Sequence, residues 1–233
     1  RHQARSARGG LAVFDVIVGG HLCLDLFPEM PYIPLEALAI PGKLYETGPM
    51  GVATGGAVSN TGLALNRLGV SVGLMASVGD DFIGQAITGV LRARDPRLVE
   101  LIKLRPGTSS SYTVVLSPLG ADRVFLHFTG NNATFTPSDI DPAGLRGAKI
   151  FHLGYPSLLP RLTDDNGAGL VKVLRAAHKA GAATSLDMTL PDENADAGLL
   201  DWHAIFKSAL PHVDVFVPTI EEALFTLRRA DFD

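Results

Sequence analysis

The sequence of 233 residues predicts an α/β fold in which a parallel sheet is covered by helices on both faces. Two observations carry this prediction. Short runs of β-branched and other apolar residues alternate with helical segments of about ten residues or more. Hydrophobic residues make up 46% of the chain and charged residues 19%, which is the balance of a globular protein with a full core.

The first elements follow from local patterns. Residues 12–18 form a β-branched apolar run that ends at two glycines, as a buried strand does. Residues 28–51 are interrupted by Pro and Gly, so they suit a small sheet or flap better than a helix. Apolar spacing over residues 58–68 predicts a helix that Gly69 ends. A strand over 70–76 and a helix over 82–92 are predicted next.

The second half continues the alternation. Segments 112–116 and 123–128 are strand-like and flank a hairpin connection. Thr136 is a predicted N-cap with a proline at the next position, so a short helix is expected to begin there. The remaining predicted elements are strands over 149–153, 184–187 and 213–217, and helices over 167–180, over 201–210 and from 218 onward.

Charge and composition exclude several classes of protein. The net charge is −4, and the only dense cationic run lies at residues 1–8, so we expect a basic flexible arm over 1–11 and no nucleic-acid partner. Cys23 is the only cysteine and cannot form an internal disulfide, which is typical of a reducing compartment and predicts a cytoplasmic location.

The most apolar stretch, residues 11–27, is not expected to enter a membrane. It contains Asp15, His21 and Asp25, and no small-residue cleavage site follows it, so neither a spanning helix nor a signal peptide is predicted. The seven histidines show no metal-ligand spacing and are predicted to be core or surface residues.

Polar residues at the carboxyl ends of strands are the first candidates for a binding site in such folds. Asp25 follows the first predicted strand within an otherwise apolar segment. A carboxylate accepts several hydrogen bonds, which suits the vicinal diol of a sugar. A turn-forming aspartate explains the residue equally well.

A second candidate leads into the predicted helix over 58–68. Gly55 and Gly56 would let the backbone approach a ligand closely, and Asn60 supplies one donor and one acceptor for a hydroxyl. A flexible loop with Ser59 or Asn60 as N-cap is the alternative. Neither standard glycine-rich phosphate loop is matched, so a dinucleotide-dependent oxidoreductase is not favoured.

Several segments together resemble the ribokinase-like sugar kinases, the phosphofructokinase-B family. Gly55-Gly56, Asn60, Leu68-Gly69 and the run Val-Gly-Asp-Asp-Phe-Ile-Gly at 78–84 have the order and spacing of that family's first signature. Residues 20–25, 127–133 and 218–223 resemble three further segments of the family. The resemblance covers residues 12–233 and implies a ribokinase-like three-layer α/β/α sandwich with a small β lid at about 28–54.

The resemblance also implies an activity, which is ATP-dependent phosphorylation of a sugar or sugar-like hydroxyl with Mg²⁺. The expected partners are a small-molecule sugar or nucleoside and a second copy bound through the lid, with no membrane partner. The expected substrate-binding residues are Asp25, Gly55, Gly56 and Asn60; Asp187 and Thr219 are expected on the nucleotide phosphate side, with Glu222 organising magnesium and its waters.

The sequence departs from the family pattern in two respects. Thr219 stands where the family has an asparagine, and Thr219 with Glu222 also matches a capping box, a role compatible with the metal role. The family's Gly-Ala-Gly-Asp-type turn, which carries the catalytic base and the anion hole, has no counterpart, so the base is expected downstream of Asp233 and this chain alone is expected to be inactive. The alternative function is a non-catalytic sugar- or nucleoside-binding module on the same fold.

Overall fold

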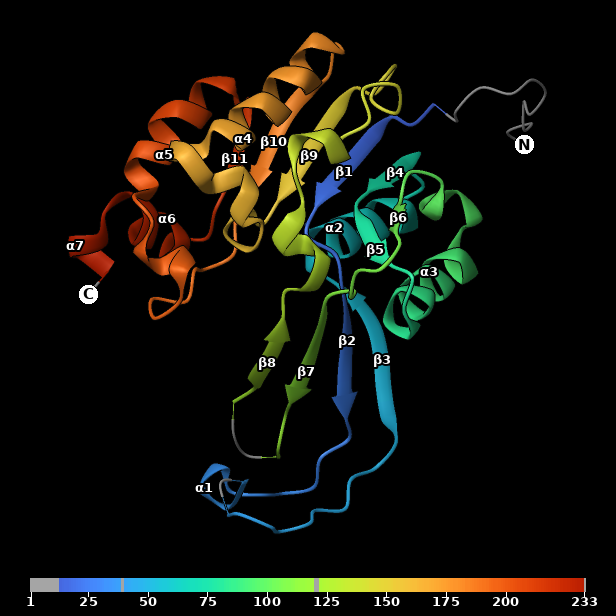
Figure 1. Ribbon diagram of the computed structural model, residues 1–233, viewed down its shortest axis with the longest axis vertical. Coiled ribbons are helices and arrows are strands. Elements are labelled where there is room, and N and C mark those ends of the chain that lie inside the picture. Colours follow the sequence, from blue (N-terminus) through green and yellow to red (C-terminus); the bar gives the residue numbers. More distant parts are fainter. Residues whose placement is uncertain (1–12, 39, 120–121, 233) are drawn as a thin grey trace.

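The computed structural model describes residues 13–38, 40–119 and 122–232. The predicted basic arm over 1–11 lies outside the described residues. A five-stranded sheet, parallel throughout, forms the centre of the body, with the strand order β11-β10-β9-β1-β4 (Figure 1). Its strands are β1 (Val16–Gly20), β4 (Val72–Met75), β9 (Ile150–Gly154), β10 (Ala183–Asp187) and β11 (Val215–Val217).

Helices pack on both faces of this sheet, which confirms the predicted three-layer arrangement. One face contributes Ile17, Phe151 and Leu186 to a core shared with α4 (Pro160–Lys179) and α5 (Trp202–Ala209). The alternate residues of the strands point to the other face, where Val18 and Leu74 pack with α2 (Gly56–Arg67) and α3 (Phe82–Arg94). Helices α2 and α3 cover only β1 and β4. At the opposite edge of the sheet, Val215 and Val217 of β11 are 53% and 51% exposed.

A second sheet projects from the body and is called the lid here, after the lid predicted for this part of the chain (Figure 1). Its order is β3-β2-β7-β8, and its strands are β2 (Cys23–Pro28), β3 (Met50–Gly55), β7 (Tyr112–Leu116) and β8 (Val124–Phe128). The one-turn helix α1 (Leu35–Leu38) lies in the loop between β2 and β3. Residues 28–54 therefore supply the outer loop and most of one strand, and the sheet also includes β2 and the mid-chain hairpin.

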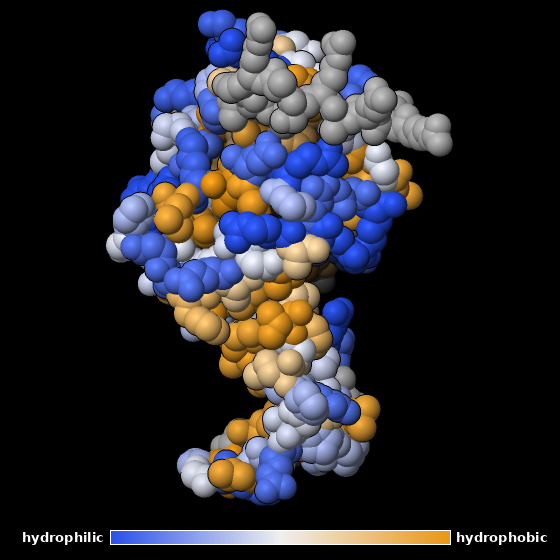
Figure 2. Space-filling model, turned by 90° about the vertical axis from the view of Figure 1, so that its right-hand side faces the viewer, coloured by the Kyte–Doolittle hydropathy of each residue, from blue (hydrophilic) through white to orange (hydrophobic). Residues whose placement is uncertain are grey.

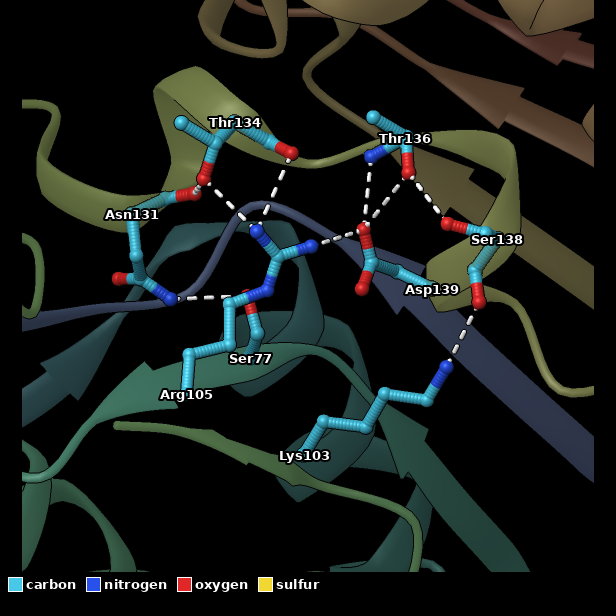
Figure 3. Close-up of polar contacts among 8 residues, drawn as sticks. All are labelled: Ser77, Lys103, Arg105, Asn131, Thr134, Thr136, Ser138 and Asp139. Carbon is cyan, nitrogen blue, oxygen red and sulfur yellow. Dashed lines mark hydrogen bonds and ion pairs between the residues drawn. The ribbon is translucent and has the colours of Figure 1, made fainter. Parts of the chain in front are cut away.

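The base of the lid is tied to the body by a polar network around Arg105 (Figure 3). Arg105 belongs to β6 (Lys103–Arg105), which pairs with β5 (Ser77–Gly79). Its guanidinium donates to the carbonyl and hydroxyl oxygens of Thr134, at 3.2 and 2.8 Å, and forms an ion pair with buried Asp139. Asn131 donates to the Ser77 hydroxyl at 2.8 Å. These contacts fix the segment that returns from β8 against the body.

Two features of the body differ from the predicted elements. Helix α4 begins with a short turn at Pro160, and four non-helical residues, Asp164 to Gly167, separate this turn from the long helical part, which agrees with the helix predicted over 167–180. The short strands β5 and β6 have too few residues to show a pattern in the sequence. The last helices are α6 (Ile220–Leu227) and α7 (Arg229–Phe232). Within the described ranges, no helix has the length and apolar character that crossing a bilayer requires.

Candidate functional site

The carboxyl ends of three body strands meet the start of α2 where the lid joins the body. The amide of His21, just after β1, donates to the Gly154 carbonyl at the end of β9 (3.3 Å), and the His21 carbonyl accepts from Val58 in α2 (3.1 Å). The Tyr155 amide donates to the Asp187 carbonyl at the end of β10 (3.2 Å). Backbone hydrogen bonds thus hold together the edge of the sheet at which ligands bind in α/β folds.

The structure explains both glycines of the turn that enters α2. A Cβ atom at Gly55 would lie 2.1 Å from the Asp25 carboxylate. Gly56 has φ of +81°, and a Cβ there would lie 2.5 Å from both the ring and the carbonyl of His21. Asp25 and His21 thus lie directly against the backbone of this turn, so that no side chain larger than that of glycine fits at either position. Asn60 lies on the second turn of α2 and is exposed.

Asp25 lies on the inner face of the lid sheet, defined here by Cys23, Asp25, Phe27, Thr113, Val115, Phe125 and His127. The Cys23 thiol donates to Asp25 Oδ1 at 3.3 Å. Farther out, Phe27, Val115 and Phe125 line a cavity of about 740 Å³ that reaches Asp25 at its inner end. Asp25 therefore contributes a carboxylate to an open cleft whose other walls are mostly apolar.

Two carboxylates lie on the body, Asp187 at the end of β10 and Glu222 in the first turn of α6. Burial raises the pKa of Asp187 to about 6, the Met188 amide hydrogen bond (2.8 Å) opposes this shift, and the charge of nearby Glu222 adds to it. Glu222, on α6, is 8% exposed. Asp187 holds its proton readily because its charged form is disfavoured, and a divalent cation would favour that charged form. Mg²⁺ needs only one or two carboxylates and retains several of its water ligands, so this pair of acids suits it. Within residues 13–38, 40–119 and 122–232, no group of three potential ligands forms a complete metal cage.

The predicted capping box at the start of α6 is confirmed. The Thr219 amide donates to Glu222 Oε2 at 2.7 Å, and the Glu222 amide donates to Thr219 Oγ1 at 3.2 Å. This pair therefore has a structural role. A carboxylate has two oxygens and about four acceptor positions, so the cap leaves Glu222 able to accept further hydrogen bonds from metal-bound waters.

Sequence reasoning missed two residues beside the turn that enters α2, His21 and Tyr155. Burial raises the pKa of Tyr155, the charges of Asp187 and Glu222 raise it further, and the nearby Asn60 side chain lowers it. Burial lowers the pKa of His21 to about 3, with a smaller contribution from His127, so His21 is neutral at physiological pH. The signal for both residues was their position shortly after a predicted strand, and His21 also belongs to the segment 20–25 that resembles the family.

The raised pKa of Asp187 predicts a measurable dependence of stability on pH. The folded protein binds this proton more tightly than the unfolded chain, whose ordinary value is near 3.8. The stabilisation that comes from binding this proton is complete below about pH 3.8 and is lost as pH rises through about 6. Asp187→Asn is therefore expected to raise the free energy of unfolding by about 1–2 kcal/mol at pH 7 and by much less at pH 4.

Urea unfolding of the wild type and Asp187→Asn across pH 4–7.5 measures this difference. Asp196→Asn, at an exposed position, is the matched control and is expected to show no such trend. An equal effect of Asp187→Asn at pH 4 and pH 7 would contradict the assigned environment of Asp187.

A three-layer α/β body from which a small β-sheet projects is the architecture of the ribokinase-like fold. The family model described as pfkB family carbohydrate kinase matches residues 22–233, and the chain belongs to this family. The resemblance seen in the sequence is thereby confirmed.

The relatives agree with this assignment. The chain is 27% identical over 177 residues to fructokinase-2 of Solanum lycopersicum, an alignment that covers 75% of this chain and 50% of the relative. It is 29% identical over 177 residues to the probable fructokinase-2 of Arabidopsis thaliana, with the same coverage. The chain thus spans about half the length of the curated relatives that it matches.

Solved structures confirm the ribokinase-like fold. A fructokinase with bound ATP from Xylella fastidiosa superposes with a TM-score of 0.71 at 21% identity, covering 95% of this chain and 63% of that chain. An Arabidopsis thaliana ribokinase complexed with ribose and ATP gives a TM-score of 0.66 at 17% identity, covering 92% of this chain and 63% of that chain.

Proposed function

We propose that the full-length protein is a carbohydrate kinase that transfers the γ-phosphoryl group of ATP to a hydroxyl of a sugar or sugar-like substrate. The observation that carries the proposal is the packing around the start of α2. Asp25 lies against Gly55, and a Cβ at Gly154 would lie 2.0 Å from the Cβ of Ala57 and 3.9 Å from that of Asp187, whose pKa is also raised by the charge of Glu222. A carboxylate that suits a diol and an acid pair that suits a cation thus lie on either side of the first residues of α2. Membership of the pfkB family supports the same activity.

Each side of the cleft has a separate task in this proposal. Asp25 accepts hydrogen bonds from sugar hydroxyls, and the Gly55-Gly56 backbone lets the sugar approach the start of α2 closely. Asn60 adds a donor and an acceptor from the second turn of the same helix. Phosphoryl transfer depends mainly on positioning and charge stabilisation, so these contacts orient the acceptor hydroxyl. The general base and the anion hole are assigned to polypeptide outside the 233 residues.

Magnesium and the nucleotide belong to the body side. Asp187 would hold Mg²⁺ directly or through a water, and Glu222 would order its waters, while Thr219 stands on the nucleotide phosphate side. When bound, Mg²⁺ would neutralise part of the negative charge on the phosphates of ATP. The carboxylate environment described above fits such an ion because a cation would favour the charged form of Asp187, which burial and, to a smaller extent, the charge of Glu222 disfavour.

Binding of ligands to the full-length protein tests the proposal. Fructose, ribose, other sugars and nucleosides are screened by thermal shift, because a ligand that binds the folded state raises its melting temperature by mass action. We expect a sugar to raise it, and ATP with Mg²⁺ to raise it independently. A shift with nucleosides or sugars but none with ATP and Mg²⁺ would favour the non-catalytic binding module.

The proposed cellular location rests on the cysteine. Cys23 is buried, and it is the only cysteine of the 233 residues. Burial raises the pKa of its thiol, so the reactive thiolate is suppressed. We therefore propose a cytoplasmic protein that does not depend on disulfides.

The outer face of the lid sheet is the proposed dimer interface. Leu26, Val52, Val114 and Leu126 stand side by side across all four strands, and Phe128 packs against Tyr112 beside them. Val52, Leu126 and Phe128 are 46%, 54% and 44% exposed. Figure 2 shows apolar residues gathered where the lid meets the body. Contiguous apolar patches of this kind mark interaction sites, so we assign a second copy to this face.

A charge on this face tests the dimer. Leu126→Glu is expected to raise the dimer dissociation constant at least about tenfold, because an unpaired buried carboxylate is costly. Sedimentation of the full-length protein over a concentration series measures the constant. The control is Leu199→Glu on the body, where Leu199 is 78% exposed. An unchanged dissociation constant for Leu126→Glu, or a monomeric wild type, would contradict this interface.

A further inference from the structure

The break in α4 is a turn of left-handed backbone. Asp165, Asn166 and Gly167 have φ of 51°, 51° and 80°, so three consecutive residues lie in the left-handed region. Glycine adopts this region freely, and asparagine and aspartate visit it at some cost. Within the described ranges, this is the only place where two successive non-glycine residues have positive φ. The helical geometry of α4 is therefore lost at these positions.

The side chain of Asn166 is exposed and free to rotate. It lines an open cavity of about 460 Å³ between α4 and α5, whose walls also include Lys172 and Ser208. In the part of the chain that the structure describes, no hydrogen bond holds its amide group. The nearby Asp164 carboxylate, by contrast, pairs with Arg161 at 3.3 Å. The Asn166 side chain is therefore able to approach the backbone of the residue that follows it.

The residue that follows is a glycine, and Asn166-Gly167 is the only Asn-Gly pair of the 233 residues. Because glycine has no side chain, its amide nitrogen is open to attack on a neighbouring carbonyl carbon. In a regular helix that amide is bound to the carbonyl four residues earlier, but the left-handed turn departs from this geometry. Close packing begins at the Gly167 Cα, where a Cβ would lie 2.9 Å from Ile205 Cγ2. The Asn166 Cγ and the Gly167 nitrogen precede that contact.

We propose that Asn166 is a site of spontaneous deamidation, at which the body of the protein is modified without an enzyme as the molecule ages. The Gly167 nitrogen attacks Asn166 Cγ, so an N–Cγ bond forms, the Cγ–Nδ2 bond breaks, and Nδ2 leaves as ammonia with the proton of the Gly167 amide. Water then opens the cyclic imide. Cleavage of the N–Cγ bond gives aspartate, and cleavage of the bond to the main-chain carbonyl carbon gives isoaspartate. Water is consumed, ammonia is released and nothing is oxidised or reduced, and the inference does not depend on the proposed function.

The isoaspartate product lengthens the main chain by one carbon atom where the backbone has no space. Gly167 faces Ile205 of α5, and a Cβ at Gly169 would lie 2.7 Å from the Arg161 carbonyl oxygen. Either product also adds a carboxylate directly after Asp165. The displaced backbone and the repulsion between like charges both weaken the packing of α4 against α5. The modified protein is therefore expected to melt at a lower temperature than the unmodified protein.

The test follows Asn166 in the full-length protein during incubation at 37 °C and pH 8. Trypsin releases a peptide from residue 162 to Lys172 in which Asn166 is the only asparagine, so mass spectrometry measures its conversion and enzymatic methylation detects isoaspartate. A synthetic peptide of the same residues gives the rate in an unfolded chain. Asn194, which is also exposed but precedes an alanine, is the control within the same molecule. Asn166→Gly, which tolerates left-handed backbone and has no amide to lose, is the control variant.

Asn166 is expected to react within about tenfold of the rate in the peptide, because exposed and weakly held segments open at little cost in free energy. Asn194 is expected to stay unmodified over the same period. The modified fraction, separated by anion exchange through its added charge, is expected to melt below the unmodified fraction, whereas Asn166→Gly keeps its initial melting temperature. Absence of product at Asn166 while the peptide reacts, or equal conversion at Asn194, would overturn the site. Equal melting temperatures of the two fractions would overturn its effect on packing.

Discussion

Asp25→Asn in the full-length protein is expected to weaken sugar binding by about 10- to 150-fold while ATP affinity stays within about twofold. The range follows from the 1.5–3 kcal/mol that a hydrogen bond to a charged group contributes. Asparagine has nearly the same shape, so the packing against Gly55 is kept and the change removes mainly the charge. Calorimetry with sugar and with ATP, in separate titrations, measures both affinities.

Asp15→Asn is the matched control for this variant. Asp15 precedes β1 at the opposite end of the sheet and forms an exposed ion pair with Lys149 at 2.8 Å. Its loss is expected to leave both affinities unchanged, because exposed ion pairs contribute little. If Asp25→Asn lowered ATP affinity and left sugar affinity unchanged, the sugar and nucleotide sides of the cleft would have to be exchanged.

Glu222→Gln is expected to raise the magnesium requirement and to lower turnover by about 10- to 100-fold, which is the usual effect of losing a group that orders a metal's ligands. Glutamine also serves in a capping box, so the helix start at Thr219 is kept and the melting temperature is expected to stay close to that of the wild type. Turnover of the full-length enzyme is measured against Mg²⁺ concentration.

The neighbouring residue provides the control for this second variant. Glu221 lies in the same first turn of α6 but is exposed, so Glu221→Gln changes the net charge equally without touching the cleft. Thr219→Asn, which restores the residue typical of the family, keeps a good N-cap and is expected to leave activity equal or higher. An unchanged magnesium dependence in Glu222→Gln would reduce Glu222 to its capping role.

The body of the fold was predictable from the sequence because its strands and helices are defined by local patterns. The strands predicted over 184–187 and 213–217 lie within one or two residues of β10 and β11. The composition of the lid sheet was not predictable in this way. β2 pairs with β7, a strand almost ninety residues further along the chain, and no local signal reports such a pairing.

The candidate site likewise contains residues that the sequence indicated and residues that it did not. Asp25, Gly55, Gly56 and Asn60 belong to segments with the spacing of a known family, so the amino-acid sequence alone was enough to indicate them. Tyr155 belongs to no such segment, and its left-handed backbone depends on hydrogen bonds with Asp187 and Leu158. The ring nitrogens of His21, which have no partner in the part of the chain that the structure describes, likewise depend on which groups pack around them in three dimensions. Chemistry created by tertiary packing leaves no local pattern in the sequence.

Sugar-dependent release of ADP by the full-length protein tests the central proposal most directly. The protein is incubated with ATP, Mg²⁺ and each sugar that raises its melting temperature, and both ADP and the mass of the sugar product are measured. The account predicts ADP formation that requires the sugar and matches the phosphorylated sugar one to one. A protein that binds the sugar and ATP with Mg²⁺ but forms no phosphorylated sugar would contradict it and identify a binding module on a kinase fold.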